Sequence, residues 1–271
     1  MEKKHGGIGL MIYAIAYLTF LYVPVLFLPL FSFNDSLFVA FPLKGFTTKW
    51  YAQMFEDEAM HRAFWNTLRV GFAAALASTA LALPAAKALT LNRMRGGNVL
   101  IGFANIPLFV PEIVLGISLL ILMTAAKVPL SLISVTVGHT LFCIPFALAV
   151  LMSRFEGFDR SLEEASLDLG ESGWMTFWRV TFPIVFPGVV ASLLLTFLVS
   201  FDDFMVAFFL CGTDTTLPVF IWGELRFPFK LPGVLALGAA ILIGSCILVA
   251  FAEWVRRLGT TGSGPASFGH A

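Results

Sequence analysis

Six long hydrophobic runs, separated by shorter polar segments, dominate the sequence. They cover approximately residues 8–33, 64–89, 99–124, 131–152, 184–211 and 232–254. Each is at least about 20 residues long, the length that a helix needs to cross the hydrocarbon core of a bilayer. The pattern predicts an all-α integral membrane protein with six transmembrane helices in one domain, residues 1–258. A flexible tail rich in Gly, Ser and Thr is expected over residues 259–271.

The composition supports a membrane-embedded chain. Charged residues make up 13% and hydrophobic residues 58% of the sequence, whereas soluble domains carry roughly 25% charged residues. The net charge of zero and the lack of a basic stripe argue against nucleic acid as a partner. No arrangement of a nucleophile with a base is visible, and the scattered cysteines are expected to pack in the core. We therefore expect no catalytic residue and no metal site.

Basic residues near the ends of the six spans predict the orientation. With the N-terminus inside, the cytoplasmic segments carry ten Lys and Arg residues, and the outer segments carry six. Cytoplasmic loops of membrane proteins are usually enriched in these residues. The sequence thus predicts a multi-pass protein of the inner (plasma) membrane with both termini in the cytoplasm. Lys87 and Arg69 lie near span ends, where long basic side chains are expected to snorkel.

The polar island, residues 153–183, is the longest polar stretch between two strongly apolar segments. Ser161 is expected to cap one helix that ends at Gly170, with acidic residues in its first turn. Ser172 is expected to cap a second short helix, on which helical spacing aligns three aromatic side chains: Trp174, Phe177 and Trp178. The helix pattern alone leaves two readings open, a rigid knob that another protein grips and an interfacial helix with its aromatic residues among lipid headgroups.

Three acidic residues fall within the predicted spans, where a carboxylate that faces lipid is costly and usually faces a cavity or a partner instead. Glu112 follows Pro111 in the third span, and Asp202 and Asp203 lie toward the outer end of the fifth. Neither span carries a basic residue, so a polycation could serve as counter-ion. The alternative is that Asp202 and Asp203 cap the fifth span in solvent. Neighbouring helix positions point about 100° apart, which predicts at most one of them on a path. His139 is expected to be a packed or interfacial histidine rather than a proton relay.

The order of residues in the polar island resembles a family motif. The island contains Glu164-Ala165-Ser166, three residues, Gly170, nine residues, and Val180-Thr181-Phe182-Pro183. This is similar to the EAA loop of permease subunits of binding-protein-dependent ABC importers: Glu-Ala-Ala, three residues, Gly, nine residues, Ile-x-Leu-Pro. Ser166, Val180 and Phe182 depart mildly from that pattern. The six-span frame and the cytoplasmic placement agree with the resemblance.

In that family the loop forms a coupling helix that docks into a groove of the ATPase subunit. The resemblance therefore implies the ABC importer permease fold and a set of coupling positions: Glu164, Ala165, Gly170, Trp174, Phe177 and Pro183. The sequence contains no Gly-x4-Gly-Lys-Ser/Thr motif, so this chain is not expected to bind ATP through a P-loop. We expect no cofactor in this chain, with ATP and Mg²⁺ on the partner ATPase.

Further segments look like the spermidine/putrescine branch of these permeases, and most like its second permease. They are Ser200-Phe201-Asp202-Asp203-Phe204, Thr216-Leu217-Pro218, Thr48-Lys49-Trp50-Tyr51 and Pro111-Glu112. The resemblance links five positions to polyamine passage: Trp50, Glu112, Ser200, Asp202 and Asp203. The family usually has Asp where this chain has Glu112, which keeps the acidity with a longer reach.

Residues and resemblance together predict an ABC importer permease that moves putrescine, spermidine or a similar cationic amine. The expected partners are an ATPase dimer, a second homologous permease, an extracytoplasmic solute-binding protein and membrane lipid. One alternative is an ABC permease for another small organic solute. An ion-coupled secondary transporter would predict inverted repeats and broken helices, neither of which is clear in the sequence. A non-transporting membrane scaffold would leave the acids without a role.

Overall fold

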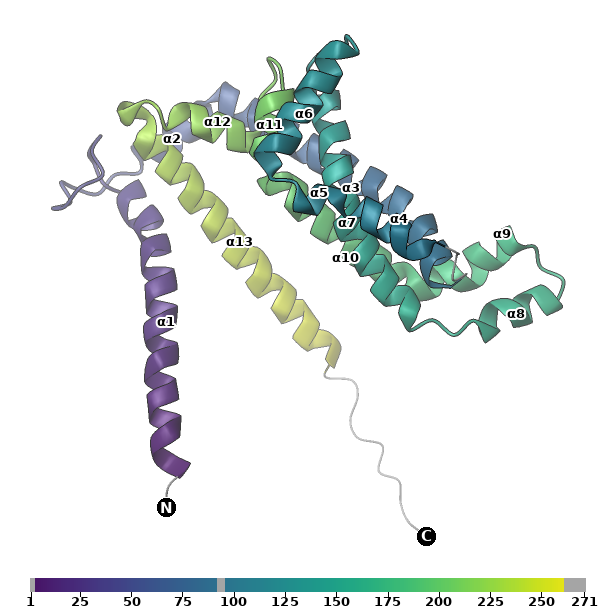
Figure 1. Cartoon of the computed structure of the whole chain (residues 1–271). Coiled ribbons are helices and arrows are strands. Elements are labelled where there is room, and N and C mark those ends of the chain that lie inside the picture. Colours follow the sequence, from purple (N-terminus) through teal and green to yellow (C-terminus); the bar gives the residue numbers. More distant parts are fainter. Residues whose placement is uncertain (1–2, 92–95, 261–271) are drawn as a thin grey trace. The chain divides into compact units, whose positions relative to one another are not determined.

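The computed structural model describes residues 3–91 and 96–260, which form helices joined by loops (Figure 1). An isolated bridge pairing between Asn34 and Phe46 is the exception among these residues. The chain divides into two compact units, one built from the described parts of 1–58 and 223–271 and the other from residues 59–222. The predicted tail lies outside the described residues from position 261 on, and helix α13 is described to Thr260.

The smaller unit contains two long helices and two short ones: α1 (Lys3–Ser32), α2 (Lys49–Glu56), η2 (Pro228–Lys230) and α13 (Leu231–Thr260). Helix α13 packs against both α1 and α2. Trp50 of α2 is buried, and its indole nitrogen donates a hydrogen bond of 2.9 Å to the carbonyl of Asn34. Because a buried indole N–H needs an acceptor, this bond fixes Trp50 within its own unit.

The larger unit holds the remaining elements in chain order: α3 (Glu58–Thr90), α4 (Gly97–Ala104), α5 (Ile106–Phe109), α6 (Glu112–Ala125), α7 (Leu132–Glu156), α8 (Ser161–Asp168), α9 (Gly173–Thr176), η1 (Phe177–Thr181), α10 (Phe182–Asp202), α11 (Met205–Leu210) and α12 (Leu217–Glu224). Helices α7 and α10 pack along each other, and α11 packs on α6 and α7. Short α8 lies beyond the ends of α7 and α10 (Figure 1).

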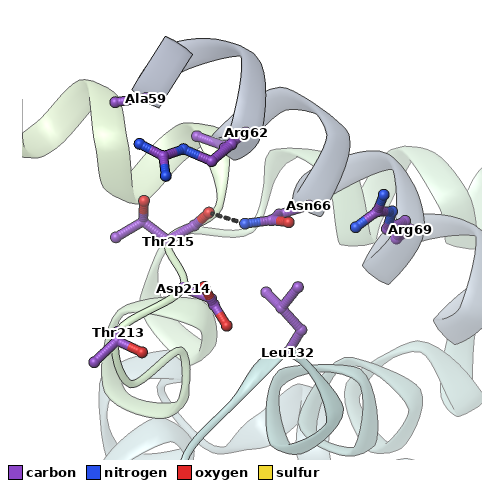
Figure 2. Close-up of a pocket in the computed structure, with 9 residues that line it drawn as sticks. Ala59, Arg62, Asn66, Arg69, Leu132, Thr213, Asp214 and Thr215 are labelled. Carbon is purple, nitrogen blue, oxygen red and sulfur yellow. Dashed lines mark hydrogen bonds between the residues drawn. The ribbon is translucent and has the colours of Figure 1, made fainter.

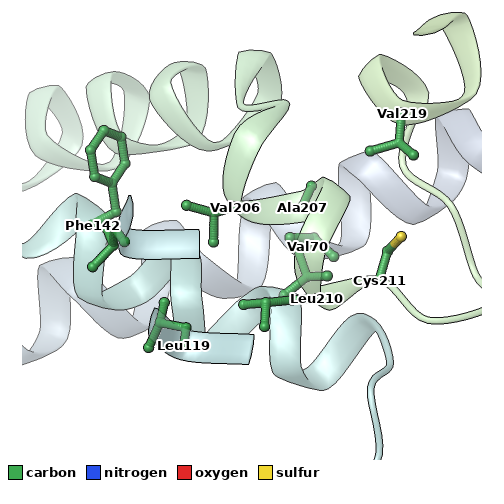
Figure 3. Packing of buried hydrophobic residues seen from close by; sticks show 10 residues of the cluster. Val70, Leu119, Phe142, Val206, Ala207, Leu210, Cys211 and Val219 are labelled. Carbon is green, nitrogen blue, oxygen red and sulfur yellow. The ribbon is translucent and has the colours of Figure 1, made fainter. Parts of the chain in front are cut away.

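Two apolar clusters hold the larger unit together. The first surrounds α11, where Val206, Ala207 and Leu210 meet Val70 of α3 and Phe142 of α7 (Figure 3). The second joins α3, α7 and α10 nearer to α8 through buried residues that include Ala86, Leu151, Phe155 and Val185. Small residues in the second cluster bring the helix backbones close, as is common where membrane helices pack.

The all-α membrane fold is confirmed, but six continuous spans are not. Five helices in the described residues are long and apolar enough to cross a membrane: Gly9–Ser32, Glu58–Thr90, Leu132–Glu156, Gly173–Asp202 and Pro228–Ile247. The expected third span is instead broken into α4, α5 and the 14-residue α6. Pro111 explains the second break, because a residue before proline avoids helical geometry and Val110 is extended, with φ −85° and ψ 128°.

The expected fifth span, 184–211, is also interrupted. Its helix begins at Gly173, within the polar island, and ends at Asp202. Asp203 is extended, with φ −68° and ψ 126°, and α11 follows as a separate short helix. The break places the two neighbouring aspartates in different backbone conformations, and the 100° rule for adjacent helix positions therefore does not apply to them.

Candidate functional site: a polar loop and two pockets of the larger unit

The polar island folds as a short helix, α8, followed by a helical stretch that runs on into α10. Ser161 is not the cap that the sequence suggested. The carboxylate of Asp159 accepts the hydrogen bond from the Ser161 backbone N–H at 3.0 Å, and Ser161 lies in the first turn. Gly170 follows α8 with φ +88°, a left-handed conformation that favours glycine. The prediction that Gly170 terminates this helix is confirmed.

The second predicted helix of the island is capped as expected. The Ser172 hydroxyl oxygen accepts a hydrogen bond of 3.3 Å from the Met175 N–H. The helix is not separate, however, because α9 continues through the π-helical turn η1 into α10. The wide turn directly precedes the first turn of α10, which contains Pro183. Proline cannot donate to the carbonyl four residues earlier, and wider helical turns are a common way to accommodate such a missing bond.

The three aromatic side chains of this stretch lie together, as their spacing predicted. The ring centroids of Trp174 and Trp178 are 5.7 Å apart, and those of Phe177 and Trp178 are 5.2 Å apart. Trp174 remains 70% exposed. The aromatic rings line a groove of about 480 Å³ together with Lys87 and Pro84 of α3. An exposed aromatic face of this kind is typical of a surface that binds another molecule.

The two neighbouring glutamates of α8 have different surroundings. Glu164 is exposed, whereas Glu163 is half-buried and its carboxylate lies 2.7 Å from the ammonium of Lys87. The Thr181 hydroxyl donates to the same carboxylate oxygen. Burial alone would raise the pKa of Glu163, but the hydrogen bonds from Lys87 and Thr181, with the nearby positive charges, hold the pKa below its ordinary value. The expectation that Lys87 merely snorkels is therefore wrong.

A buried polar cluster lies at the break between α10 and α11. His139 of α7 is 1% exposed, its Nδ1 lies 2.7 Å from the Ser200 hydroxyl, and its Nε2 lies 3.0 Å from the Asp203 carboxylate. The same carboxylate accepts a hydrogen bond of 3.0 Å from the Ala207 N–H in the first turn of α11. The expectation of a packed histidine holds. Its contact with Asp203 was missed, because the two residues are far apart in sequence and no local pattern links them.

All three predicted membrane acids line one pocket of about 450 Å³. Glu112, Asp202 and Asp203 share it with apolar residues that include Phe142, Phe146 and Phe204. Glu112 and Asp202 are exposed, whereas Asp203 is buried. Both aspartates therefore line one pocket although only Asp202 is exposed, and the proposed solvent cap fails for Asp203.

The other two predicted path residues do not line the acid pocket. Ser200 holds the imidazole of His139 instead, and Trp50 belongs to the smaller unit. Among the residues that the structure describes, the lining of the acid pocket includes no Lys or Arg. Its acids therefore lack a lysine or arginine counter-ion in the pocket wall.

A second polar pocket, of about 480 Å³, was not predicted from the sequence. Arg62, Asn66 and Arg69 project into it from one face of α3, opposite the loop that carries Asp214 and Thr215 (Figure 2). The Asn66 amide donates to the Thr215 carbonyl at 3.1 Å. Spacing of four and three residues along a helix was the sequence signal that could have grouped the three α3 side chains. Two guanidinium groups make this pocket unfavourable for a cation.

Helices of membrane-spanning length, a polar loop between two of them and an acid pocket define a membrane transport component. Residues 78–258 match the family described as binding-protein-dependent transport system inner membrane component. The chain belongs to this family, whose members are multi-pass inner-membrane transport components and not enzymes. Family membership excludes the ion-coupled secondary transporter and the scaffold, although the broken helices alone would have favoured the former.

Individual relatives agree with the family. The chain is 34% identical over 244 residues to the putrescine transport system permease protein PotI of Escherichia coli, covering 87% of this chain and 86% of the relative. It is 32% identical over 259 residues to the spermidine/putrescine transport system permease protein PotC of the same organism, covering 95% and 96%. The resemblance noted in the sequence is thereby confirmed.

A solved structure supports the fold. The chain matches the crystal structure of a bacterial ABC transporter involved in the import of the acidic polysaccharide alginate, with a TM-score of 0.70. The match covers 93% of this chain and 95% of that chain at 18% sequence identity. At this identity the match shows the architecture and carries no information about the transported solute.

Proposed function

We propose that this chain forms half of the translocation path of an ABC importer and carries putrescine, spermidine or a closely similar polyamine. The acid pocket is the observation that carries the proposal. Glu112 and Asp202 present exposed carboxylates to a space whose lining, within the described part of the chain, includes no Lys or Arg residue. A cation with two or more ammonium groups would neutralise both acids. Relatives named for putrescine and spermidine transport point to the same class of solute.

The acids of the pocket have different roles in this proposal. Glu112 and Asp202 bind the ammonium groups of the polyamine transiently. Asp203 is held by His139 and by the Ala207 N–H, so it shapes the pocket, and Ser200 acts through His139. The role of Trp50 in the path rests on the family resemblance alone. Its indole N–H is already bonded to a backbone carbonyl in the smaller unit.

The polar island couples this path to ATP hydrolysis. Exposed Glu164 and Ala165, the turn at Gly170, and the aromatic face of Trp174 and Phe177 would dock on one subunit of an ATPase dimer. Pro183 then marks the point where the docked segment joins the membrane helix α10. ATP and Mg²⁺ bind to the ATPase, and closure of the dimer moves the helices of this chain as rigid bodies.

The proposed complex has further components. A second homologous permease completes the path, an extracytoplasmic solute-binding protein delivers the polyamine, and lipid surrounds the apolar helix faces. Both termini and the polar island lie in the cytoplasm in this arrangement. Arg69 and Lys87 lie toward opposite ends of the 33-residue helix α3. The pocket lined by Arg62 and Arg69 therefore opens on the outer side in this arrangement.

A reconstituted complex tests the proposal. The chain, its second permease and the ATPase dimer would be placed in lipid nanodiscs, and ATP hydrolysis would be measured with the binding protein loaded with putrescine or spermidine. We expect stimulation by at least one polyamine and none by an uncharged sugar such as maltose. A lack of stimulation by every polyamine would contradict the substrate proposal. Failure of an ATPase dimer to copurify with the chain would contradict the coupling proposal.

A further inference from the structure

Helix α8 is held in place without an apolar core. None of its eight residues is buried. It packs against α9 and η1, and side-chain hydrogen bonds and ion pairs make its fixed contacts. The Ser166 hydroxyl lies 3.0 Å from the Thr176 hydroxyl, and Glu163 reaches both Lys87 and Thr181. A short helix with no buried side chain is marginal by itself, so these polar contacts decide where α8 sits.

Glu163 makes a polar contact that reaches beyond the island. Its partner Lys87 lies in the last turn of α3, which is one of the helices long enough to cross the membrane. Both side chains are about four-fifths shielded from solvent, with 22% of Lys87 and 19% of Glu163 exposed. A charge-assisted hydrogen bond at 2.7 Å in such shielded surroundings is stronger and more directional than a surface ion pair.

The first and last residues of the π-helical turn η1 both contact the pair formed by Lys87 and Glu163. Phe177 begins the turn, and its ring lies beneath the Lys87 ammonium, 5.2 Å from the ring centroid. Thr181 ends the turn and donates its hydroxyl to Glu163. Wide helical turns of this kind recur at functional sites. The Glu163 carboxylate therefore links α8 to Lys87 of α3 and to Thr181 of η1, and Phe177 of η1 contacts the same lysine.

We infer that Glu163 is a positioning residue that latches α8 to the end of α3, so that movement of the docked island is transmitted to α3 as well as along α10. The inference rests on the proposed coupling role of the island. It assigns different tasks to the neighbouring glutamates. Glu164 faces outward toward the ATPase, and Glu163 faces inward toward the membrane helix. Without the latch, the island would still reach the ATPase but would move independently of α3.

The test uses the reconstituted complex and three variants: Glu163→Gln, the charge swap Lys87→Glu with Glu163→Lys, and Glu171→Gln. Glu171→Gln is the matched control, because it breaks an exposed ion pair with Arg179 in the same loop that does not involve α3. Two readouts are measured on each. Hydrogen exchange of α8 amides reports its position, and putrescine uptake per ATP hydrolysed reports coupling. Copurification of the ATPase dimer checks that each variant assembles.

We expect Glu163→Gln to speed α8 exchange by about tenfold, the scale of losing a charge-assisted hydrogen bond. Uptake per ATP should fall severalfold while ATP hydrolysis continues. The charge swap should restore both readouts in part, and Glu171→Gln should change neither. Unchanged exchange in Glu163→Gln, or faster exchange with unchanged uptake per ATP, would overturn the latch.

The proposed function fails in a different way from the latch. If the unaltered complex hydrolyses ATP without taking up putrescine, spermidine or any other polyamine tested, then the substrate proposal is overturned. Hydrogen exchange of α8, in Glu163→Gln and in the charge swap, would still test the latch contact in that case, because this readout does not depend on which solute is carried.

Discussion

Two acids of the larger unit, Glu163 and Asp203, each contact a nitrogen-bearing side chain. Their surroundings differ, and this difference distinguishes a contact that stabilises the fold from one that positions a mobile helix. Glu163 meets Lys87 at 2.7 Å with side chains that are 19% and 22% exposed. Asp203 meets His139 at 3.0 Å with side chains that are 3% and 2% exposed. The two contact distances are similar. The two pairs differ in how much water can reach the remaining side chain when one partner is removed.

This difference in hydration sets the consequence of breaking each pair. A buried acid that loses its partner keeps its desolvation penalty, and the fold is destabilised. A partly exposed acid recovers much of the lost interaction from water, and the helix that carries it is merely released. The Asp203 cluster is therefore part of the fold of the α10–α11 break, whereas the Glu163 contact can control the position of α8 without being needed for folding.

Removing the buried acid should give the largest effect. Asp203→Ala takes away the partner of His139 and the acceptor for the Ala207 N–H. We expect a loss of roughly 3 kcal/mol or more in the free energy of unfolding, because both groups stay buried. Unfolding in detergent, followed by tryptophan fluorescence, measures it.

Asp202→Ala is the matched control for that experiment, since Asp202 is adjacent and exposed. It should change the free energy of unfolding by no more than about 0.5 kcal/mol. Equal stability losses in the two variants would mean that burial does not separate the roles of the two aspartates.

The turn after α8 should give the next largest effect. Gly170 has φ +88°, and nothing lies within 4 Å of a side chain built there, so the conformation and not space restricts the position. Gly170→Val should cost roughly 1–2 kcal/mol of local stability, because the left-handed conformation is strained for a residue with a Cβ. Uptake should fall strongly. Gly170→Asn should retain more uptake, since Asn tolerates this conformation better. Equal losses would point instead to direct contact of Gly170 with the ATPase.

Local signals made part of this site predictable from the sequence. Ser172 as a cap, Gly170 as a stop and the aromatic spacing from Trp174 depend on neighbouring residues, and the structure confirms them. The contacts of Glu163 with Lys87 and of Asp203 with His139 join different helices. No periodicity within one segment encodes such a contact, so the sequence could supply the residue types but not the pairs.

The length of the hydrophobic runs also hid the breaks in the spans. The run over residues 99–124 is apolar enough for one helix, but Pro111 divides it. The fifth run is interrupted at Asp203, where no proline or glycine signals an end. The acids that the sequence singled out for their chemistry are therefore also the places where the backbone departs from the expected helices.

Neutralising the exposed acids of the pocket should affect transport more than stability. Glu112→Gln and Asp202→Asn keep the size of each side chain and remove its charge from a pocket whose described lining residues include no Lys or Arg. We expect each to lower polyamine uptake severalfold, and the free energy of unfolding to change by no more than about 0.5 kcal/mol. Uptake measured in proteoliposomes at several putrescine concentrations tests this. Normal uptake in both variants would mean that these acids do not contact the amine.

The smallest expected effect is a pH dependence of the contact between Glu163 and Lys87, the partly exposed pair. The pKa of Glu163 is lowered in the folded protein, so its contribution to holding α8 is present above the unfolded pKa, about 4.3, and is lost as pH falls through the folded value. The other groups near it include the basic side chains Lys87 and Arg160 and the hydroxyl of Thr181, and Arg179 is paired with Glu171. Protection of α8 amides, corrected for intrinsic exchange, should therefore stay constant above about pH 5 and decline below it. Glu163→Gln should show a smaller step, because Asp159, whose pKa is also lowered by its hydrogen bonds with Ser161, still titrates at the start of α8. If the variant shows the same decline, then another acid controls α8, and the ion pair with Lys87 is not what holds the helix against α3.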